Sequence, residues 1–161
     1  MLALKIYRLS NFFYKKNCKV LSKILDIINY YLHNSIIPGS CKIGKKTKLA
    51  YGGIGVVIHS NAEIGEGCLI GQGITIGGRN GEIEVPKIGD NTYIGAGSRI
   101  LGKVLIEGDT VIGPNSVVLK NISRYSVVAG VPAKVINEIT EDNYKKYFTY
   151  CEFKSYKKTK N

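Results

Sequence analysis

An aliphatic residue returns at every sixth position between Ile58 and Val118. The positions are Ile58, Ile64, Ile70, Ile76, Ile88, Ile94, Ile100, Ile106, Ile112 and Val118, in phase across the gap between Ile76 and Ile88. Neither an α-helix, with a period of about 3.6, nor an alternating strand, with a period of about 2, produces this spacing. A fixed period of this kind indicates a solenoid, in which each repeat packs only against its neighbours.

Two further columns indicate the shape of the coil. Three residues after each aliphatic position stand Gly, Asn or Asp, except at Arg79 and Lys103. These types accept a left-handed backbone most readily, so the chain is predicted to turn a corner there. Two residues before the aliphatic positions, most side chains are small: Ala62, Cys68, Thr92, Ser98, Thr110 and Ser116. The pattern predicts an all-β solenoid with triangular coils of about 18 residues and a narrow interior. A sandwich with frequent turns would not hold phase over so many repeats.

The chain divides by pattern into three parts. Residues 1–36 carry helical apolar stripes with a break near Asn11 and Lys15, which predicts two short helices. Residues 37–136 form the predicted solenoid of about five coils, with a loop at 78–87 where a charged stretch interrupts the period. Residues 137–161 are predicted to form a short helix, Ile139 to Phe153, and a basic tail. The first helices either cap the solenoid or a neighbouring subunit, or lie on the inner face of the membrane as a basic amphipathic segment.

Composition limits the functional classes. The net charge is +11, and the lysines gather at both ends of the chain. No nucleic-acid-binding module is recognisable, so no nucleic-acid partner is expected. The four cysteines, Cys18, Cys41, Cys68 and Cys151, form no C-x-x-C pair and are predicted to be reduced, as in a cytoplasmic protein. No secretory signal is apparent, and no apolar run is long enough to span a membrane.

His59 is the most conspicuous candidate for chemistry. It follows Ile58 in a column that glycine fills at most other repeats, and alternation points it outward. Imidazole is the side chain best suited to accept a hydroxyl proton near neutral pH. The alternative is a surface histidine without a role. The other histidine is His33, and two histidines are too few for a three-histidine zinc site, so no metal is expected.

The repeated pattern of Ile or Val, then Gly, then four variable residues resembles the hexapeptide-repeat acyltransferases, which fold as left-handed parallel β-helices and are generally trimers. Several runs look like the serine acetyltransferase branch, and closer still like its short relatives among capsule and lipopolysaccharide O-acetyltransferases. These runs are residues 37–39, 43–44, 53–59, 62–65, 71–78, 86–91, 94–97, 116–120 and 129–136.

The resemblance also implies roles for individual residues. Acetyl-CoA would lie between subunits, and the positions that touch it would be Gly78, Ala96, Pro114, Lys120 and Lys134. The acceptor would contact Tyr51, Gly77 and Arg79, and backbone N–H groups near Gly77 and Gly78 would stabilise the oxyanion. His59 would be the catalytic base.

The sequence departs from the serine acetyltransferase pattern in three places. Ala50 and Tyr51 stand where that branch carries an Asp–His pair, Val85 stands where it carries a second histidine, and the N-terminal part is short. The sequence therefore predicts an acetyl-CoA-dependent O-acetyltransferase that modifies a hydroxyl of a surface-polysaccharide sugar or its precursor. The alternatives are a serine O-acetyltransferase of cysteine biosynthesis and a non-catalytic β-helix binding protein.

Overall fold

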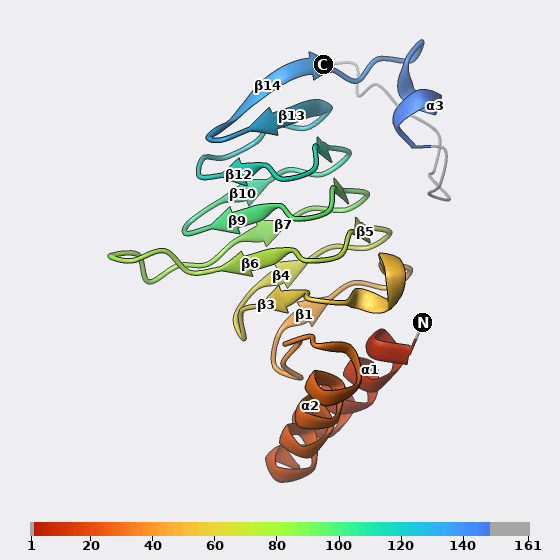
Figure 1. Ribbon diagram of the computed structural model, residues 1–161, viewed down its shortest axis with the longest axis vertical. Helices are drawn as coiled ribbons and strands as arrows, with labels where there is room; N and C mark the ends of the chain where they lie inside the picture. The colour runs from red at the N-terminus through yellow and green to blue at the C-terminus, as the bar shows by residue number, and fades with distance from the viewer. Residues whose placement is uncertain (1, 149–161) are drawn as a thin grey trace.

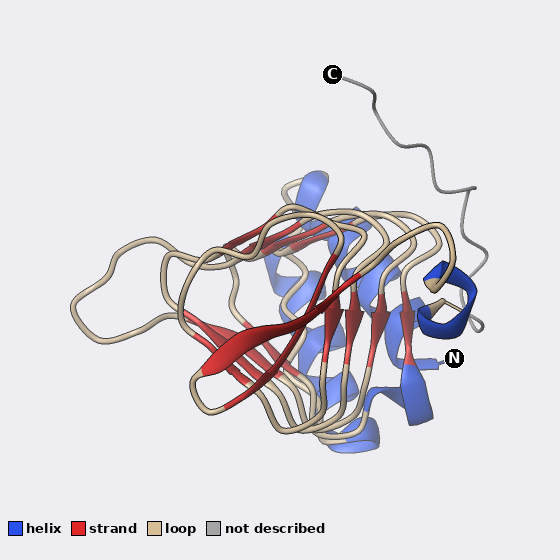
Figure 2. Ribbon diagram, turned by 90° about the horizontal axis from the view of Figure 1, so that it is seen from above, coloured by secondary structure: helices blue, strands red, loops and turns tan. Residues whose placement is uncertain are grey.

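A computed structural model describes residues 2–148 as a triangular β-solenoid with a helical hairpin at its N-terminal end (Figures 1 and 2). The helices are α1 (Leu2–Lys15), α2 (Lys19–His33) and α3 (Tyr144–Tyr147), with a 3-10 turn, η1 (Ala50–Gly53). The strands are β1 (Lys42–Ile43), β2 (Lys48–Leu49), β3 (Val57–Ile58), β4 (Glu63–Ile64), β5 (Leu69–Ile70), β6 (Thr75–Gly77), β7 (Lys87–Ile88), β8 (Tyr93–Ile94), β9 (Arg99–Leu101), β10 (Leu105–Ile106), β11 (Val111–Ile112), β12 (Val117–Val118), β13 (Ser126–Gly130) and β14 (Ala133–Glu138).

The strands stack into three sheets. Sheet A has the order β12-β9-β6-β3, sheet B β1-β4-β7-β10, and sheet C β14-β13-β11-β8-β5-β2. Every pairing is parallel except β13–β14. Each sheet therefore takes one strand from each of four coils, and β13 adds the start of another. The prediction of a solenoid is confirmed, with four complete coils in place of about five.

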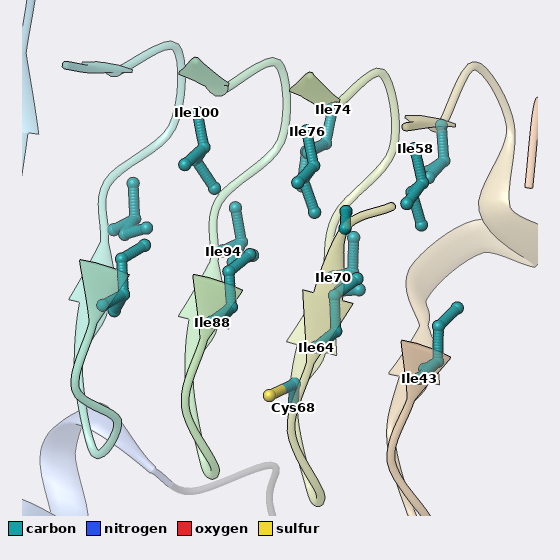
Figure 3. Packing of buried hydrophobic residues seen from close by; sticks show 14 of the residues in the cluster. Ile43, Ile58, Ile64, Cys68, Ile70, Ile74, Ile76, Ile88, Ile94 and Ile100 are labelled. Atoms are coloured by element: carbon teal, nitrogen blue, oxygen red, sulfur yellow. The ribbon is translucent and has the colours of Figure 1, made fainter. Parts of the chain in front are cut away.

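The aliphatic ladder forms the core. All ten ladder residues are buried, and register pairs such as Ile58–Ile76 and Ile76–Ile100 place them directly above one another (Figure 3). The predicted small inward positions, from Ala62 to Ser116, are buried as well. The buried Ser98 hydroxyl lies within hydrogen-bond distance of two backbone acceptors, the carbonyls of Gly95 and Gly113. The interior therefore has the same kind of side chain at each level, because the period of six returns it to the same place.

The three corners of the coil are not equivalent. Positive φ angles occur at the predicted corner positions Gly67, Gly73, Asn91, Gly97, Asp109 and Asn115. The four remaining positions, Asn61, Arg79, Lys103 and Asn121, do not have them, and all four follow a strand of sheet A. The corner after sheet A therefore does not use a left-handed residue at this position, where it accepts Arg and Lys, although Gly102 directly after β9 has a positive φ.

The first coil contains a rebuilt corner. Leu49 and Ile58 are nine residues apart rather than six, and η1 takes up the extra length. Positive φ angles at Tyr51, Gly52, Gly53 and Gly55 reverse the chain sharply there. The irregularity that the broken phase predicts is therefore a lengthened corner between sheets C and A.

The helical hairpin is held to the coil by polar contacts. The Tyr7 hydroxyl is buried; it donates to the Cys41 carbonyl at 2.8 Å and accepts from the Ile43 N–H at 3.1 Å. Burial raises the pKa of Tyr7, because the phenolate would be desolvated. Between the helices, Ser10 bonds to Ser22 and Asp26. The predicted pair of short helices, with a break near Lys15, is observed.

The C-terminal end differs from the prediction. Strand β14 extends to Glu138 and pairs back on β13 as an antiparallel hairpin, which the sequence analysis did not anticipate. Ile139 is buried and donates its N–H to the Tyr125 carbonyl at 2.7 Å, so the predicted helix cannot begin there. Only Tyr144–Tyr147 is helical. The rest of the predicted helix and tail, residues 149–161, lies outside the described residues. The division into parts 1–36, 37–136 and 137–161 stays a prediction.

Candidate active site

The ends of the sheet A strands bring His59 and Gly77 together. Ile58 pairs with Ile76, so His59 and Gly77 occupy the same column in adjacent coils. The His59 N–H donates to the Ile76 carbonyl at 2.8 Å. His59 is half-buried on the outside of the coil, as alternation predicts. Gly78 follows at the corner, exposed, where the chain leaves the coil.

Gly78 has a free backbone N–H. One coil further on, the Gly102 N–H donates to the Gly77 carbonyl at 3.0 Å. The equivalent bond, from Gly78 to the His59 carbonyl, is not formed, and that carbonyl accepts from the Ala62 N–H at 3.0 Å. Within residues 2–148 the Gly78 N–H therefore has no hydrogen-bond partner, and it can bind an oxygen atom of a ligand.

Packing does not explain why this corner has two glycines. A Cβ atom at Gly78 would meet nothing within 4 Å, and one at Gly77 would make only ordinary contacts of 3.6 Å and longer. Neither residue has a positive φ. A glycine without an internal steric reason marks a place where another molecule can approach the backbone closely.

The imidazole of His59 is held by its neighbour. Its Nδ1 accepts a hydrogen bond from the Asn61 N–H at 3.1 Å. In this arrangement the neutral ring carries its proton on Nε2, so the exposed nitrogen is a donor. For Nε2 to accept a hydroxyl proton, the proton must move to Nδ1 and the bond from Asn61 must break. No carboxylate within the described part of the chain forms an ion pair with the ring.

The loop between β6 and β7 folds back on the next coil. It projects from the edge of the coil in Figure 1 and occupies 78–86, close to the predicted 78–87. The Glu82 carboxylate accepts from the Lys103 N–H at 2.5 Å, and Glu84 pairs with the Lys103 ammonium at 2.6 Å. Arg79 lies 3.8 Å from the Glu82 carboxylate and remains half exposed. The loop is thus anchored to the next coil at Lys103, with the Arg79 guanidinium beside the Glu82 carboxylate.

The residues predicted to bind acetyl-CoA lie at both edges of sheet A. Ala96 and Pro114 share a column at the corner that precedes this sheet, where the Asn115 N–H donates to the Ala96 carbonyl at 2.8 Å. Lys134 pairs with Ala129 in the β13–β14 hairpin. Lys120 lies at the opposite corner, in register with Gly102, and is exposed. On the His59 edge, Gly78 is therefore one coil from His59 and Lys120 three coils from it, whereas Ala96, Pro114 and Lys134 are across the sheet.

Tyr51 is also separated from His59. It belongs to η1, at the corner that precedes β3, whereas His59 follows β3. Its side chain is 75% exposed and its φ is +49°, a left-handed conformation that costs a bulky residue energy. Such conformations concentrate at functional sites. One protomer therefore does not bring Tyr51 and His59 to one point, and the two predicted groups lie at opposite ends of the same short strand.

Metal-binding chemistry has no candidate here. Within residues 2–148 no group of three or more His, Cys, Asp or Glu side chains could hold an ion. His33, at the end of α2, belongs to a different region, and its Nδ1 is buried without a partner in the described structure.

The sequence analysis missed a hollow next to this site. It lies between α2 and residues 35–38 and measures about 470 Å³. No motif marks it, because its lining comes from a helix and a connecting segment rather than from the repeat. A larger hollow, about 570 Å³, lies between α1 and residues 46–48 and contains none of the predicted site residues.

Comparisons with known proteins identify the relatives of this chain. Residues 86–120 match the family "Bacterial transferase hexapeptide (six repeats)". The serine acetyltransferase of Staphylococcus epidermidis is 37% identical over 127 residues, which is 78% of this chain and 59% of that protein. That of Staphylococcus aureus is 39% identical over 117 residues, 71% of this chain and 54% of that protein. The chain therefore spans less than two thirds of the length of these relatives.

The similar solved structures are also serine acetyltransferases. A serine acetyltransferase in complex with CoA has a TM-score of 0.76 at 31% identity. The match covers 83% of this chain and 55% of the serine acetyltransferase chain. The serine acetyltransferase of Brucella abortus strain S19 has a TM-score of 0.81 at 30% identity, with 85% and 56% covered. These relatives are all serine acetyltransferases, so the closer resemblance to capsule and lipopolysaccharide enzymes stays a prediction. The chain carries the left-handed β-helix of the hexapeptide-repeat acyltransferases and belongs to their serine acetyltransferase-like branch.

Proposed function

We propose that this protein transfers an acetyl group from acetyl-CoA to a hydroxyl group at the corner formed by His59, Gly77 and Gly78. The observation that carries the proposal is the free N–H of Gly78, beside an outward imidazole and an open space where no Cβ intrudes. Acyl transfer from a thioester builds up negative charge on the carbonyl oxygen, and a fixed N–H donor stabilises that charge. The similarity to serine acetyltransferases, one of them solved with CoA, supports the same chemistry.

The acceptor has two candidates. The relatives support L-serine, the predicted alternative, better than a polysaccharide sugar, the main prediction. A sugar hydroxyl stays the second candidate, because Tyr51 and Val85 replace the histidines expected from the serine acetyltransferase pattern. The acceptor hydroxyl would approach the corner from the outside of sheet A.

The residues would divide the work as follows. His59 would accept the hydroxyl proton once the bond from Asn61 is released, and the Gly78 N–H would bind the oxyanion. Lys120 would meet the phosphates of the donor by charge attraction, and Arg79 is placed to contact the donor or the acceptor. Holding both substrates at this corner would supply much of the rate by positioning.

A homotrimer would complete the site. Ala96, Pro114, Lys134 and Tyr51 lie across sheet A from His59, so a neighbouring protomer could bring its own copies of these residues to the His59 corner. The molar mass from light scattering tests this, since a monomer would leave the two groups apart.

Contact between the N-terminal helices and a membrane surface is a separate proposal. It is supported by exposed apolar side chains on both helices, among them Leu9, Phe12 and Val20, next to lysines. No helix in the described range is long and apolar enough to cross a bilayer. Sedimentation with vesicles that contain anionic lipid tests whether the hairpin binds the surface.

The decisive experiment separates the acceptors and the role of His59. The protein is incubated with acetyl-CoA and, in turn, L-serine, sugar nucleotides and polysaccharide, and acetylated products are detected by mass. His59→Ala should lose at least a hundredfold in kcat, because a general base contributes about 10²–10⁴. His59→Gln keeps an N–H donor at the same reach but no base. If His59→Gln keeps most of the wild-type kcat, the ring acts as a donor and the base is elsewhere; failure to bind acetyl-CoA at all would favour a non-catalytic binding protein.

A further inference from the structure

The hollow between α2 and the segment leading into the coil has the properties of a ligand site. Its lining includes Ile27, Tyr30, Tyr31, Lys23, Ile36 and Pro38, and its volume of about 470 Å³ falls in the range of small-molecule pockets. Such pockets combine apolar and aromatic walls with a few polar groups. None of these residues takes part in the function proposed above.

Register connects this hollow to His59. Ile36 forms a parallel bridge with Val57, and the Ile58 N–H donates to the Ile36 carbonyl at 2.8 Å. The segment therefore extends sheet A by one more chain, with Ile37 buried beneath Ile58 and Pro38 in the column of His59. Ile36 and Pro38 face outward, as His59 does, so the hollow opens at the next step of the column that carries the imidazole.

The walls of the hollow are tied together. The Asp26 carboxylate, on α2, accepts from the Gly39 N–H at 3.1 and 3.2 Å and from the Ser10 hydroxyl at 2.6 Å. The Ser35 hydroxyl donates to the Gly53 carbonyl at 2.7 Å. These bonds fix α2 and the entering segment to the coil, so the hollow is formed before any ligand arrives.

The lining suits a ring-shaped acceptor. Tyr30 and Tyr31 lie with ring centroids 5.5 Å apart and planes at 71°, and Tyr31 is 80% exposed. Aromatic rings offer a large rigid apolar surface with a polar hydroxyl tip. A pyranose has an apolar C–H face for such rings and hydroxyl edges for the tyrosine hydroxyls and the Lys23 ammonium.

We propose that this hollow is the acceptor subsite and that it takes a cyclic polyol of the hexopyranoside class, which places one of its hydroxyl groups at His59. Tyr31, Tyr30 and Pro38 are then specificity-determining residues, and the N-terminal hairpin is part of the acceptor site. The inference rests on the proposed acetyl transfer and chooses the second of its acceptors.

Saturation-transfer NMR tests binding without any turnover. The probes are the methyl glycosides of glucose, galactose and mannose, with L-serine as the comparison, and the variants are Tyr31→Ala and Tyr30→Ala in the full chain. Tyr14→Ala is the matched control, an exposed tyrosine on α1 away from the hollow. At least one glycoside should bind the wild type and Tyr14→Ala equally, and Tyr31→Ala should raise its Kd at least tenfold.

Two results would overturn the inference: no glycoside binds the wild type, or Tyr31→Ala binds a glycoside as tightly as the wild type does. If Tyr31→Ala in the second case also breaks an oligomer, a second copy of the chain covers the tyrosines. Glycoside binding that Tyr31→Ala abolishes, in a protein that transfers no acetyl group, would uphold the subsite and refute only the proposed function.

Discussion

Two glycine-to-alanine substitutions should have opposite consequences, and the pair tests where the active site lies. Gly95 lies under the next coil, and a Cβ there would be 2.5 Å from the Pro114 nitrogen and 2.8 Å from two more backbone atoms. Backbone atoms in a stacked coil cannot move aside singly. Gly78 lies at the corner of the site, and a methyl group added there would have no other atom within 4 Å.

The two substitutions should shift the melting temperature in opposite directions. Overpacking of this kind costs about 1–3 kcal/mol or more, and for a domain of this size each kcal/mol shifts Tm by about 2–4 °C. Gly95→Ala should therefore melt about 2–12 °C below the wild type. Gly78→Ala should restrict the unfolded chain and stabilise the protein by about 0.4–1 kcal/mol, which raises Tm by about 1–4 °C.

Kinetics complete the test. The new methyl group of Gly78→Ala occupies space that the thioester needs, while the N–H group stays. The KM for acetyl-CoA should rise about tenfold, equivalent to about 1.4 kcal/mol, with kcat changed much less. Calorimetry and a CoA-release assay on both variants supply the numbers. The reasoning is refuted if Gly78→Ala melts as low as Gly95→Ala, which would make the glycine structural, or if its KM is that of the wild type.

Three other outcomes follow from buried and anchored groups. Tyr7→Phe leaves the Cys41 carbonyl and the Ile43 N–H without their partner, so unfolding in urea should show a loss of about 2 kcal/mol, and an unchanged midpoint would contradict the docking described for α1. Burial raises the pKa of the Cys41 thiol to about 12. A pKa that is higher in the folded than in the unfolded protein stabilises the fold fully below the unfolded pKa, and this contribution is lost as the pH rises through the folded pKa, so the free energy of unfolding should decline between about pH 9 and 12. At pH 8, in a Cys151→Ser background, a thiol reagent should label the exposed Cys18 long before Cys41. Glu82→Ala removes one of the two anchors of the 78–86 loop, its bond from the Lys103 N–H, so limited proteolysis should cut that loop faster while Tm stays within about 2 °C of the wild type.

Much of the fold was predictable because a single constraint repeats. Burial at Ile58, Ile64 and each later ladder position follows from a period that no other architecture satisfies. The first corner was only partly predictable, since the nine-residue step from Leu49 to Ile58 reveals extra length but not its conformation. The β13–β14 hairpin was missed although its pairing is local, between residues 126–130 and 133–138, because Ile139 reads equally well as the start of a helix.

The sequence predicted the kind of candidate site but not all of the groups that form it. His59 stood out because it replaces glycine in a regular column, and register then brings it next to Gly77. The tautomer of its ring depends on the Asn61 N–H, a local backbone contact that no pattern encodes. The hollow at Tyr31 depends on how α2 docks, which the Asp26–Gly39 bonds determine and the apolar stripe of the helix does not.

The position of the site follows from the inequality of the three corners. Two of them have a left-handed residue in every coil, which is Gly, Asn or Asp except for Lys46 and Tyr51 in the first coil, so few side-chain types are suited to them. The corner after sheet A has no such requirement, and the two exceptions in the corner column, Arg79 and Lys103, both lie there. A side chain or a loop can be added at this edge without conformational strain, which is where His59, the inserted loop and Lys120 are found. The edge that the backbone leaves unconstrained is therefore the edge on which a repeat protein of this kind can acquire catalytic groups, and the sequence reveals it wherever the six-residue pattern tolerates an exception.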